Sequence, residues 1–365
     1  MTMNINEVLP KLKLHGRTVV ENEKQALFFN WTCSGFTVKF TGKTLKARFT
    51  VMGDDIPAIP GFPPNPTYYP FFGVVGEDGE TLLSRQEVLE DGWFTLWESE
   101  EGAEHTLRIV KLSENSRGKL GLVELETDGE ILQAPDEKKP TIEIVGDSIT
   151  CAFGNEAPNN AFEFKTCEEN GWMSYAAIAA RELGYEFSLV SESGISATSP
   201  EHPLFPMHSM IDIYDLTDEL YDVRRGIEPI KWDFEKHHND IVVINLGTND
   251  CNPMRFCPNI EEIDPMEEYF QKQYRRFIEK VRAANGKDTV IACTLGPMDY
   301  YLYNRILAAV EEYKAETGDE NIVTFKYVGI NMVTEGYGAA GHPSLKTQIR
   351  VGHELAVRLR QYVIK

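Results

Sequence analysis

The sequence predicts an α/β protein in which a β-sandwich precedes a three-layer domain built on a parallel sheet. Its 365 residues, 42% of them hydrophobic, suffice for two domains, because single domains cluster at roughly 100 to 200 residues. In the N-terminal third, short runs of β-branched and aromatic residues alternate with polar ones, which is typical of a sheet with one face in water. In the remainder, apolar runs alternate with helical stretches, which is typical of a parallel sheet covered by helices.

The N-terminal strands are expected where the alternating runs lie between clusters of Gly, Asp, Asn or Pro. These runs span residues 26–31, 35–40, 45–51, 71–75, 93–97, 104–112 and 120–125. Short strands at this spacing favour a β-sandwich of the jelly-roll kind. The Pro-rich and aromatic segment 56–72 is too long for a tight hairpin and could reach the neighbouring domain or another subunit of a homo-oligomer.

The domain boundary is expected in the polar, turn-prone segment 127–140. We therefore assign residues 1–130 to the β-sandwich and residues 138–365 to the second domain. The expected strands of the second domain span residues 141–145, 187–191, 241–246, 290–295 and 322–328, and its clearest helices span 171–183, 265–284, 300–317 and 345–362. Ligands of such doubly wound sheets bind outside the carboxyl ends of the strands, so functional residues are sought there.

The charge balance excludes some classes of partner. The chain has 36 Lys and Arg against 57 Asp and Glu, a formal net charge of -21, which repels nucleic acids and anionic membrane surfaces. No run approaches the ~20 apolar residues of a membrane helix, and the first residues lack the apolar block of a signal peptide, so a cytoplasmic protein is expected. Its six cysteines are then expected to be free thiols, and none has metal-ligand spacing, so no metal or organic cofactor is predicted.

Four loops at the carboxyl edge of the predicted sheet carry residues suited to ester hydrolysis. Ser148 follows the first strand, Gly194 the second and Asn249 the third, while His342 precedes the last helix. Each has an ordinary structural explanation when taken alone: a strand–helix turn, a bend, a helix cap or a structural histidine. Together they supply a nucleophile, two donors for an oxyanion and a base.

The same four blocks, GDSIT, SESGIS, NLGTND and GHPS, resemble those of the SGNH (GDSL) hydrolase superfamily, over residues 141–365. The string GDSITCAFGN after a β-sandwich is similar to carbohydrate esterase family 2, and residues 213–217 and 295–298 also resemble stretches of that family. The resemblance implies a flavodoxin-like SGNH domain and an acetyl xylan esterase that removes acetyl groups from xylan or xylo-oligosaccharides without a cofactor.

The resemblance also implies roles for residues. Ser148 would attack the acetyl carbonyl and His342 would take its proton, while the N–H groups of Ser148 and Gly194 and the Asn249 amide would bind the oxyanion. The sequence departs from the common pattern where many relatives have an acid, since Ala339 and Ala340 stand before the histidine.

Two interpretations of the missing acid stay open. A backbone carbonyl could orient the base, or a carboxylate could come from elsewhere, with Glu335 and Asp299 as candidates. Asp147 and Asp250, beside the catalytic blocks, are expected to brace their turns.

The substrate is less determined by the sequence. Trp172, Met298, Tyr300 and Tyr337 are candidates for stacking on a sugar or closing an acyl pocket, although core packing explains each equally well. Two other functions remain open. One is a carbohydrate-binding protein with a vestigial hydrolase half, and the other is an SGNH lipase or thioesterase with a different acyl substrate.

Overall fold

The computed structural model describes residues 1–53, 67–198, 209–218 and 227–363. It divides into two compact units, of which the first comprises Met1–Lys138, Lys165–Trp172 and Thr217–Pro229. The second comprises Lys139–Phe164, Met173–Leu216 and Ile230–Lys365. Most of the Pro-rich segment 56–72 lies outside the described residues, so its expected reach stays a prediction.

The first unit is an antiparallel β-domain, as predicted. Its described strands form one ten-stranded sheet with the central order β3-β4-β9-β5-β8-β6-β7. The strands are β1 (Thr2–Asn4), β2 (Lys13–His15), β3 (Thr18–Glu21), β4 (Ala26–Phe29), β5 (Gly35–Met52), β6 (Phe71–Val75), β7 (Leu82–Glu87), β8 (Gly92–Lys111), β9 (Lys119–Thr127) and β10 (Ile131–Leu132). The short helices α1 (Ile5–Val8) and η1 (Leu9–Lys11) follow β1. Buried aromatic and aliphatic side chains fill its core, among them Phe29, Phe36, Phe49 and Phe72.

Two pairs of predicted strands are single long strands in the structure. The runs 35–40 and 45–51 both belong to β5, and the runs 93–97 and 104–112 both belong to β8. The turn residues between them form an irregularity in the β5–β8 pairing, where the register shifts between Gly42 and Thr44. A bulge of this kind bends a strand without ending it, so turn-prone residues alone were a misleading boundary.

The second unit is an α/β domain with the predicted parallel sheet. In the described chain the sheet has five strands in the order β12-β11-β13-β14-β15, all parallel to their neighbours. These strands are β11 (Thr141–Gly146), β12 (Glu186–Ser191), β13 (Ile241–Asn245), β14 (Val290–Leu295) and β15 (Ile322–Lys326). The strands β11 to β14 are mostly buried, because helices cover both faces of such a sheet, whereas β15 at the end of the order is less buried.

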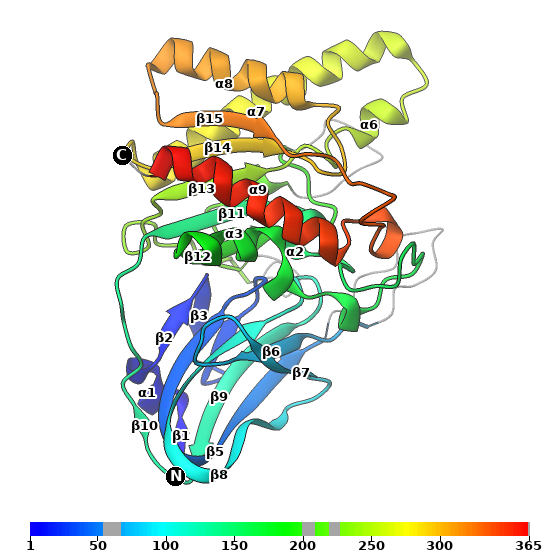
Figure 1. The fold of residues 1–365 in the computed structure, drawn as a ribbon. Coiled ribbons are helices and arrows are strands. Elements are labelled where there is room, and N and C mark those ends of the chain that lie inside the picture. The colour runs from blue at the N-terminus through cyan, green and yellow to red at the C-terminus, as the bar shows by residue number, and fades with distance from the viewer. Residues whose placement is uncertain (54–66, 199–208, 219–226, 364–365) are drawn as a thin grey trace. The chain divides into compact units, whose positions relative to one another are not determined.

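The helices of the second unit begin and end close to the predicted residues. The long ones are α3 (Tyr175–Leu183), α7 (Ile263–Asn285), α8 (Tyr303–Thr317) and α9 (Leu345–Val363), and the short ones are α2 (Ser148–Cys151), α4 (Met210–Ile213), α6 (Asn252–Arg255), η4 (Ile260–Glu262) and η5 (Ala339–Gly341). The expected helix start at residue 171 is a 3-10 turn, η3 (Gly171–Met173), and α3 begins only after Ser174, whose hydroxyl caps it. Figure 1 shows α9 running beside α3, and α7 beside α8.

The carboxyl ends of β11, β12 and β13 therefore meet at one edge of the sheet. The register pairs Gly146 with Ser191 on one side and with Asn245 on the other. The loops after these three residues carry Ser148, Gly194 and Asn249. The fold thus gathers three of the four predicted blocks by the ordinary geometry of a parallel sheet.

Candidate active site

Ser148 is the first residue of the short helix α2, directly after β11. The preceding Asp147 caps this helix, and its carboxylate accepts a hydrogen bond of 2.9 Å from the N–H of Ile149. Gly146 allows the tight turn, because a Cβ there would lie 1.9 Å from the hydroxyl oxygen of Thr150. The N–H groups of Ile149, Thr150 and Cys151 all bond Asp147, which leaves the N–H of Ser148 as the donor of this turn for an anion.

His342 reaches Ser148 across a sequence separation of 194 residues. Its Nε2 lies 2.9 Å from Oγ of Ser148, and its Nδ1 lies 3.0 Å from the carbonyl oxygen of Ala339. A carbonyl only accepts, so Nδ1 carries the proton and Nε2 is left to accept from the serine hydroxyl. This is the tautomer that a general base needs.

The loop before His342 owes its shape to a left-handed turn. Ala340 has φ 48° and ψ 37°, and Gly341 also has a positive φ. The turn lets the N–H of His342 bond the carbonyl of Ala339, the same oxygen that holds the imidazole. A left-handed alanine costs about 1 kcal/mol or more, so surrounding contacts must hold it in place.

Those contacts come from the segment that follows α2. The N–H of Ala339 donates to the carbonyl of Gly154, and the N–H of Ala340 donates to the carbonyl of Ala161. Gly154 has no room for a side chain, since a Cβ would lie 2.3 Å from that of Ala339. The segment that begins with the nucleophile therefore also braces the loop that carries the base.

Helix α9 fixes the same segment from its other side. The side chain of Gln348 donates to the carbonyl of Ile149 at 3.0 Å and accepts from the N–H of Tyr175 at 2.7 Å. Gln348 thus joins α9, α2 and α3 through one buried amide. Sequence analysis did not single it out, because a glutamine inside a helix usually faces solvent.

The two predicted oxyanion donors lie in the second and third loops. Gly194 has a φ of 83°, a backbone conformation that residue types other than glycine rarely adopt. The side-chain amide of Asn249 donates to the carbonyl of Ile195 at 3.0 Å, so it is bonded to the Gly194 loop. An amide nitrogen has two hydrogens, and this bond uses one of them.

Two buried carboxylates lie behind these loops. Asp250 accepts hydrogen bonds from the N–H groups of Ala197 and Thr198 and from the hydroxyl of Thr198. Burial raises the pKa of Asp250 to about 6. Burial likewise raises the pKa of Asp147 to about 7, and the nearby charge of Asp250 adds to the rise. Both carboxylates brace turns, as expected, and both bind a proton more readily than an exposed aspartate.

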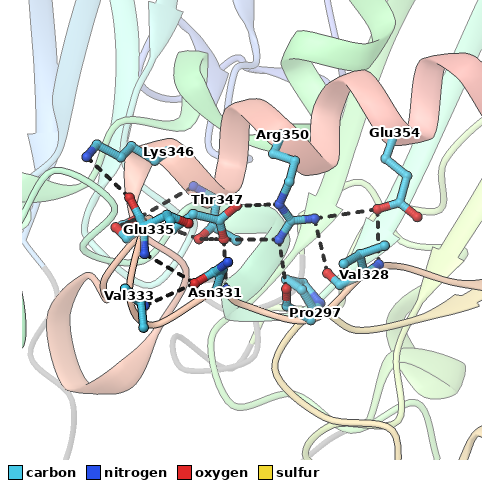
Figure 2. A network of polar contacts seen from close by, with 12 residues as sticks. Pro297, Val328, Asn331, Val333, Glu335, Lys346, Thr347, Arg350 and Glu354 are labelled. Carbon is cyan, nitrogen blue, oxygen red and sulfur yellow. Dashed lines mark hydrogen bonds and ion pairs between the residues drawn. The ribbon is translucent and has the colours of Figure 1, made fainter.

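The two carboxylates considered as substitutes for the missing acid are bonded to other groups. Glu335 forms an ion pair with Arg350 and accepts hydrogen bonds from the hydroxyl of Thr347 and the N–H of Asn331. Figure 2 shows Arg350 between Glu335 and Glu354. Asp299 forms an ion pair with Arg255 and accepts from the N–H of Tyr301.

The four aromatic and apolar candidates for substrate binding are divided between the two units. Trp172 belongs to the first unit and is buried, with its indole N–H bonded to the carbonyl of Glu80, so it has a core role. Tyr300 is half-buried and donates to the carbonyl of Tyr327 at 2.8 Å. Met298 and Tyr337 are half-buried in the second unit, and the N–H of Tyr337 bonds the side chain of Asn159.

Phe153 is a neighbour of the candidate base that sequence analysis missed. Its ring centroid lies 4.5 Å from that of His342, and the two planes make an angle of 39°. The only local signal was an aromatic residue five positions after the serine, which a core position would explain as well.

Among the described residues, no group of three or more His, Cys, Asp or Glu side chains could hold a metal ion. None of the described helices is long and apolar enough to cross a membrane. The six cysteines are free, four of them buried.

Comparison with known proteins places this arrangement in a group of hydrolases. A model of the GDSL-like lipase/acylhydrolase family matches residues 144–327. The cellulase/esterase CelE of Acetivibrio thermocellus is 33% identical over 268 residues, which cover 71% of this chain and 30% of that protein. The chain thus spans less than a third of the length of that relative.

Two further matches extend over nearly the whole chain. An acetylxylan esterase/glucomannan deacetylase of Cellvibrio japonicus is 24% identical, with 96% of this chain and 91% of that protein covered. The structure of a family two carbohydrate esterase from Clostridium thermocellum in complex with cellohexaose has 26% identity and a TM-score of 0.81, over 96% of this chain and 99% of that one. Both units of the fold are therefore shared with carbohydrate esterases.

Proposed function

Because the chain belongs to the GDSL-like lipase/acylhydrolase family, we propose that it is a serine esterase that removes acetyl groups from acetylated xylan and xylo-oligosaccharides. The observation that carries the proposal is the 2.9 Å contact between Nε2 of His342 and Oγ of Ser148. A serine hydroxyl is a weak nucleophile by itself, and an adjacent base at this distance is what activates it.

The first half of the reaction transfers the acetyl group to the enzyme. Oγ of Ser148 attacks the acetyl carbonyl carbon as Nε2 of His342 takes the hydroxyl proton. The tetrahedral intermediate collapses, the bond to the sugar oxygen breaks, and His342 gives its proton to the departing alkoxide. A sugar alcohol leaves and Ser148 carries an acetyl ester.

The second half repeats these steps with water. His342 takes a proton from water, whose oxygen attacks the acetyl carbon. The bond to Oγ breaks, acetate leaves, and the proton returns to Ser148. Each turnover consumes one ester and one water molecule and releases the sugar alcohol and acetic acid, which ionises to acetate, while the enzyme is regenerated.

The oxyanion formed in each half is bound by N–H donors. We assign this role to the backbone N–H groups of Ser148 and Gly194 and to the second hydrogen of the Asn249 amide. Each donor of this kind contributes about 3 kcal/mol to transition-state stabilisation. The Ala339 carbonyl orients His342, so the proposed machinery is a dyad held by backbone rather than a triad completed by Glu335 or Asp299.

We infer the substrate class from the names of the relatives. Their names describe acetylxylan and glucomannan deacetylation and binding of cellohexaose, so an acetylated β-linked oligosaccharide is the substrate that we propose. Free thiols at all six cysteines agree with a cytoplasmic location, which is part of the proposal. Cell fractionation would test that part.

The experiment that tests the function compares Ser148→Ala with the wild type on 4-nitrophenyl acetate, butyrate and octanoate. We expect acetate-selective turnover, and a loss of about 10⁴-fold or more in kcat for the variant. Ser188→Ala, within β12, is the matched control and should keep the wild-type rate. Release of acetate from acetylated xylo-oligosaccharides then tests the natural substrate class.

Other outcomes of the same assay would contradict the proposal in distinct ways. A rate that rises with acyl chain length would indicate a lipase or thioesterase. A wild type that is inactive on all esters, but binds xylo-oligosaccharides, would indicate a binding protein.

A further inference from the structure

Three rings of the second unit lie in consecutive contact, and the last of them is the imidazole of the candidate base. The ring centroid of Phe153 lies 4.5 Å from that of the His342 imidazole. Phe153 also contacts Phe164, which stacks on it with a centroid distance of 4.1 Å and an interplanar angle of 20°. The two phenyl rings are stacked, and the imidazole is tilted by 39° against Phe153. Phe153 and Phe164 are half-buried.

The backbone holds Phe153 in this place. Its N–H donates to the carbonyl of Ser148 at 3.0 Å, closing the turn that follows α2. The residue before it, Ala152, has a left-handed conformation with φ 68°. The residue after it, Gly154, accepts from the N–H of Ala339. Phe153 is thus anchored on one side to the nucleophile and on the other to the loop of the base.

In the proposed reaction, the contact between Phe153 and His342 bears on the positive charge that His342 acquires. His342 becomes an imidazolium each time it accepts a proton, and in a Ser-His-Asp triad the carboxylate both orients the ring and stabilises that charge. A carbonyl can orient the ring but carries no net charge. An aromatic face within about 6 Å of a cation attracts it through the quadrupole of the ring.

We propose that Phe153 is a positioning residue for His342, which fixes the plane of the imidazole and stabilises the imidazolium formed in each half-reaction. The proposal rests on the proposed function, in which His342 is the base. The ring of Phe153, on which Phe164 stacks, would thus share the two roles of a triad carboxylate, which are to orient the histidine and to stabilise its positive charge.

The first test compares Phe153→Leu, Phe153→Tyr and the matched control Phe162→Leu in steady-state hydrolysis of 4-nitrophenyl acetate. Phe162 belongs to the same segment, and its side chain is 92% exposed. We expect Phe153→Leu to lower kcat by about tenfold with KM changed by less than about twofold. Phe153→Tyr, which keeps the aromatic face, should retain kcat, and so should Phe162→Leu.

A second test keeps the shape of the ring and changes only its charge distribution. Phenylalanines carrying one, two and three fluorines are introduced at position 153, which weakens the negative face in steps. We expect kcat to fall stepwise with each fluorine. A kcat that does not respond to fluorination would overturn the electrostatic role, even if the leucine variant failed to fold.

The third test needs no substrate. The ring current of Phe153 shifts the C–H proton resonances of His342, which are assigned by their disappearance in His342→Gln. In Phe153→Leu these resonances should move, and unmoved resonances would overturn the contact itself. If KM rather than kcat changes, the ring acts on the substrate and the proposal is wrong.

The tests also separate this proposal from the proposed function. An active wild type whose Phe153→Leu variant keeps its kcat would overturn the role of Phe153 alone. A wild type that hydrolyses no ester would overturn both, whatever the position of the His342 resonances.

Discussion

At the scale of single residues, the proposed base, His342, is oriented by a peptide carbonyl. The oxygen of Ala339 bonds Nδ1 of His342 at 3.0 Å, and a carbonyl does not titrate in the working range of an esterase. The substitution of alanine for the usual acid therefore leaves the tautomer of the base intact. A backbone carbonyl has no net charge with which to stabilise the imidazolium. We assign part of that stabilisation to the aromatic ring of Phe153.

Asn249 offers the first residue-scale prediction. Its amide bonds the carbonyl of Ile195 with one hydrogen and leaves the other for the oxyanion. Asn249→Ala should lower kcat on 4-nitrophenyl acetate by about 10²-fold or more, with little change in KM, because an oxyanion donor acts only in the transition state. Asn321→Ala, before β15 at the opposite edge of the sheet, is the control. An unchanged kcat in Asn249→Ala would remove this residue from the oxyanion hole.

Asp147 gives a prediction about stability and pH. Its pKa rises from 3.8 to about 7 in the folded protein, chiefly through burial. Between these values the folded state binds a proton more readily than the unfolded chain does. The free energy of unfolding therefore falls as pH rises from about 4 to about 7, by at most about 4 kcal/mol from this group.

Asp147→Asn should lack this part of the pH dependence, because asparagine caps α2 equally well and does not titrate. Urea unfolding of the variant and the wild type at pH 4, 5.5, 7 and 8 would measure the difference, which should grow in favour of the variant with rising pH. Asp78→Asn is a control of opposite sign, since hydrogen bonds to Thr81 and Glu80 lower the pKa of the exposed Asp78. A constant difference between Asp147→Asn and the wild type would contradict the prediction.

At the scale of elements, side chains of helix α9 hold the loop before His342 in place through hydrogen bonds and ion pairs. Arg350 of α9 bonds Glu335 and the carbonyls of Val328 and Gly329, and Glu354 accepts from the N–H of Val328. These residues form the network of Figure 2. Glu335 thus acts on the loop through its bonds to Asn331, Thr347 and Arg350.

Glu335→Gln separates the two roles. We expect a loss of about 2 kcal/mol in the free energy of unfolding, because the half-buried Arg350 loses one of its two carboxylate partners. The kcat should fall by less than about tenfold, whereas removal of a triad acid costs about 10⁴-fold. Glu320→Gln, in an exposed ion pair with Lys314, is the control and should change stability little.

The pH dependence of this variant provides an independent check. Arg350 holds the pKa of Glu335 below its usual value, so the ion pair contributes stability above the pKa of the unfolded chain and loses it as pH falls through the folded value. The destabilisation by Glu335→Gln should therefore be large at pH 7 and small in acid. A loss of kcat near 10⁴-fold would restore Glu335 as a catalytic acid.

At the scale of the whole molecule, the first unit is completed by segments from later in the chain. The indole N–H of Trp31 donates to the carbonyl of Thr217 at 2.7 Å, and the buried ammonium of Lys119 lies 2.9 Å from Asp218. The N–H of Glu114 donates to the carboxylate of Glu169 at 3.2 Å. The predicted linear boundary near residue 130 could not show this, and β10 also extends the first unit beyond it.

A fragment of residues 1–138 should accordingly be much less stable than the same unit in the full chain. Its Trp31 and Lys119 would lose buried partners, at about 1 to 3 kcal/mol for the indole and more for the charge. Urea unfolding followed by tryptophan fluorescence would measure the midpoint of the fragment against that of the full chain. Equal midpoints would contradict the prediction, and the full chain variant Asp218→Asn should show an intermediate loss.

Local sequence patterns predicted the class of the fold and the location of three candidate catalytic blocks. Side chains alternate every two residues along a strand and every 3.6 along a helix, so these elements are visible in local patterns. Parallel strands align their carboxyl ends, and this rule places Ser148, Gly194 and Asn249 at one edge. Local patterns were weaker in the first unit, where Gly42 marks a bulge within β5 and not its end.

How the proposed base, His342, is held follows from contacts between distant segments and not from local patterns. The carbonyl of Ala339 reaches Nδ1 only because Ala340 turns left-handed, and Phe153 meets the imidazole only because the segment after α2 packs on that turn. Ser148 and His342 are 194 residues apart, and neither the distance between them nor the contact of Phe153 with His342 has a local signature. A sequence shows which groups a residue carries, whereas contacts across the chain depend on how the packed segments constrain one another.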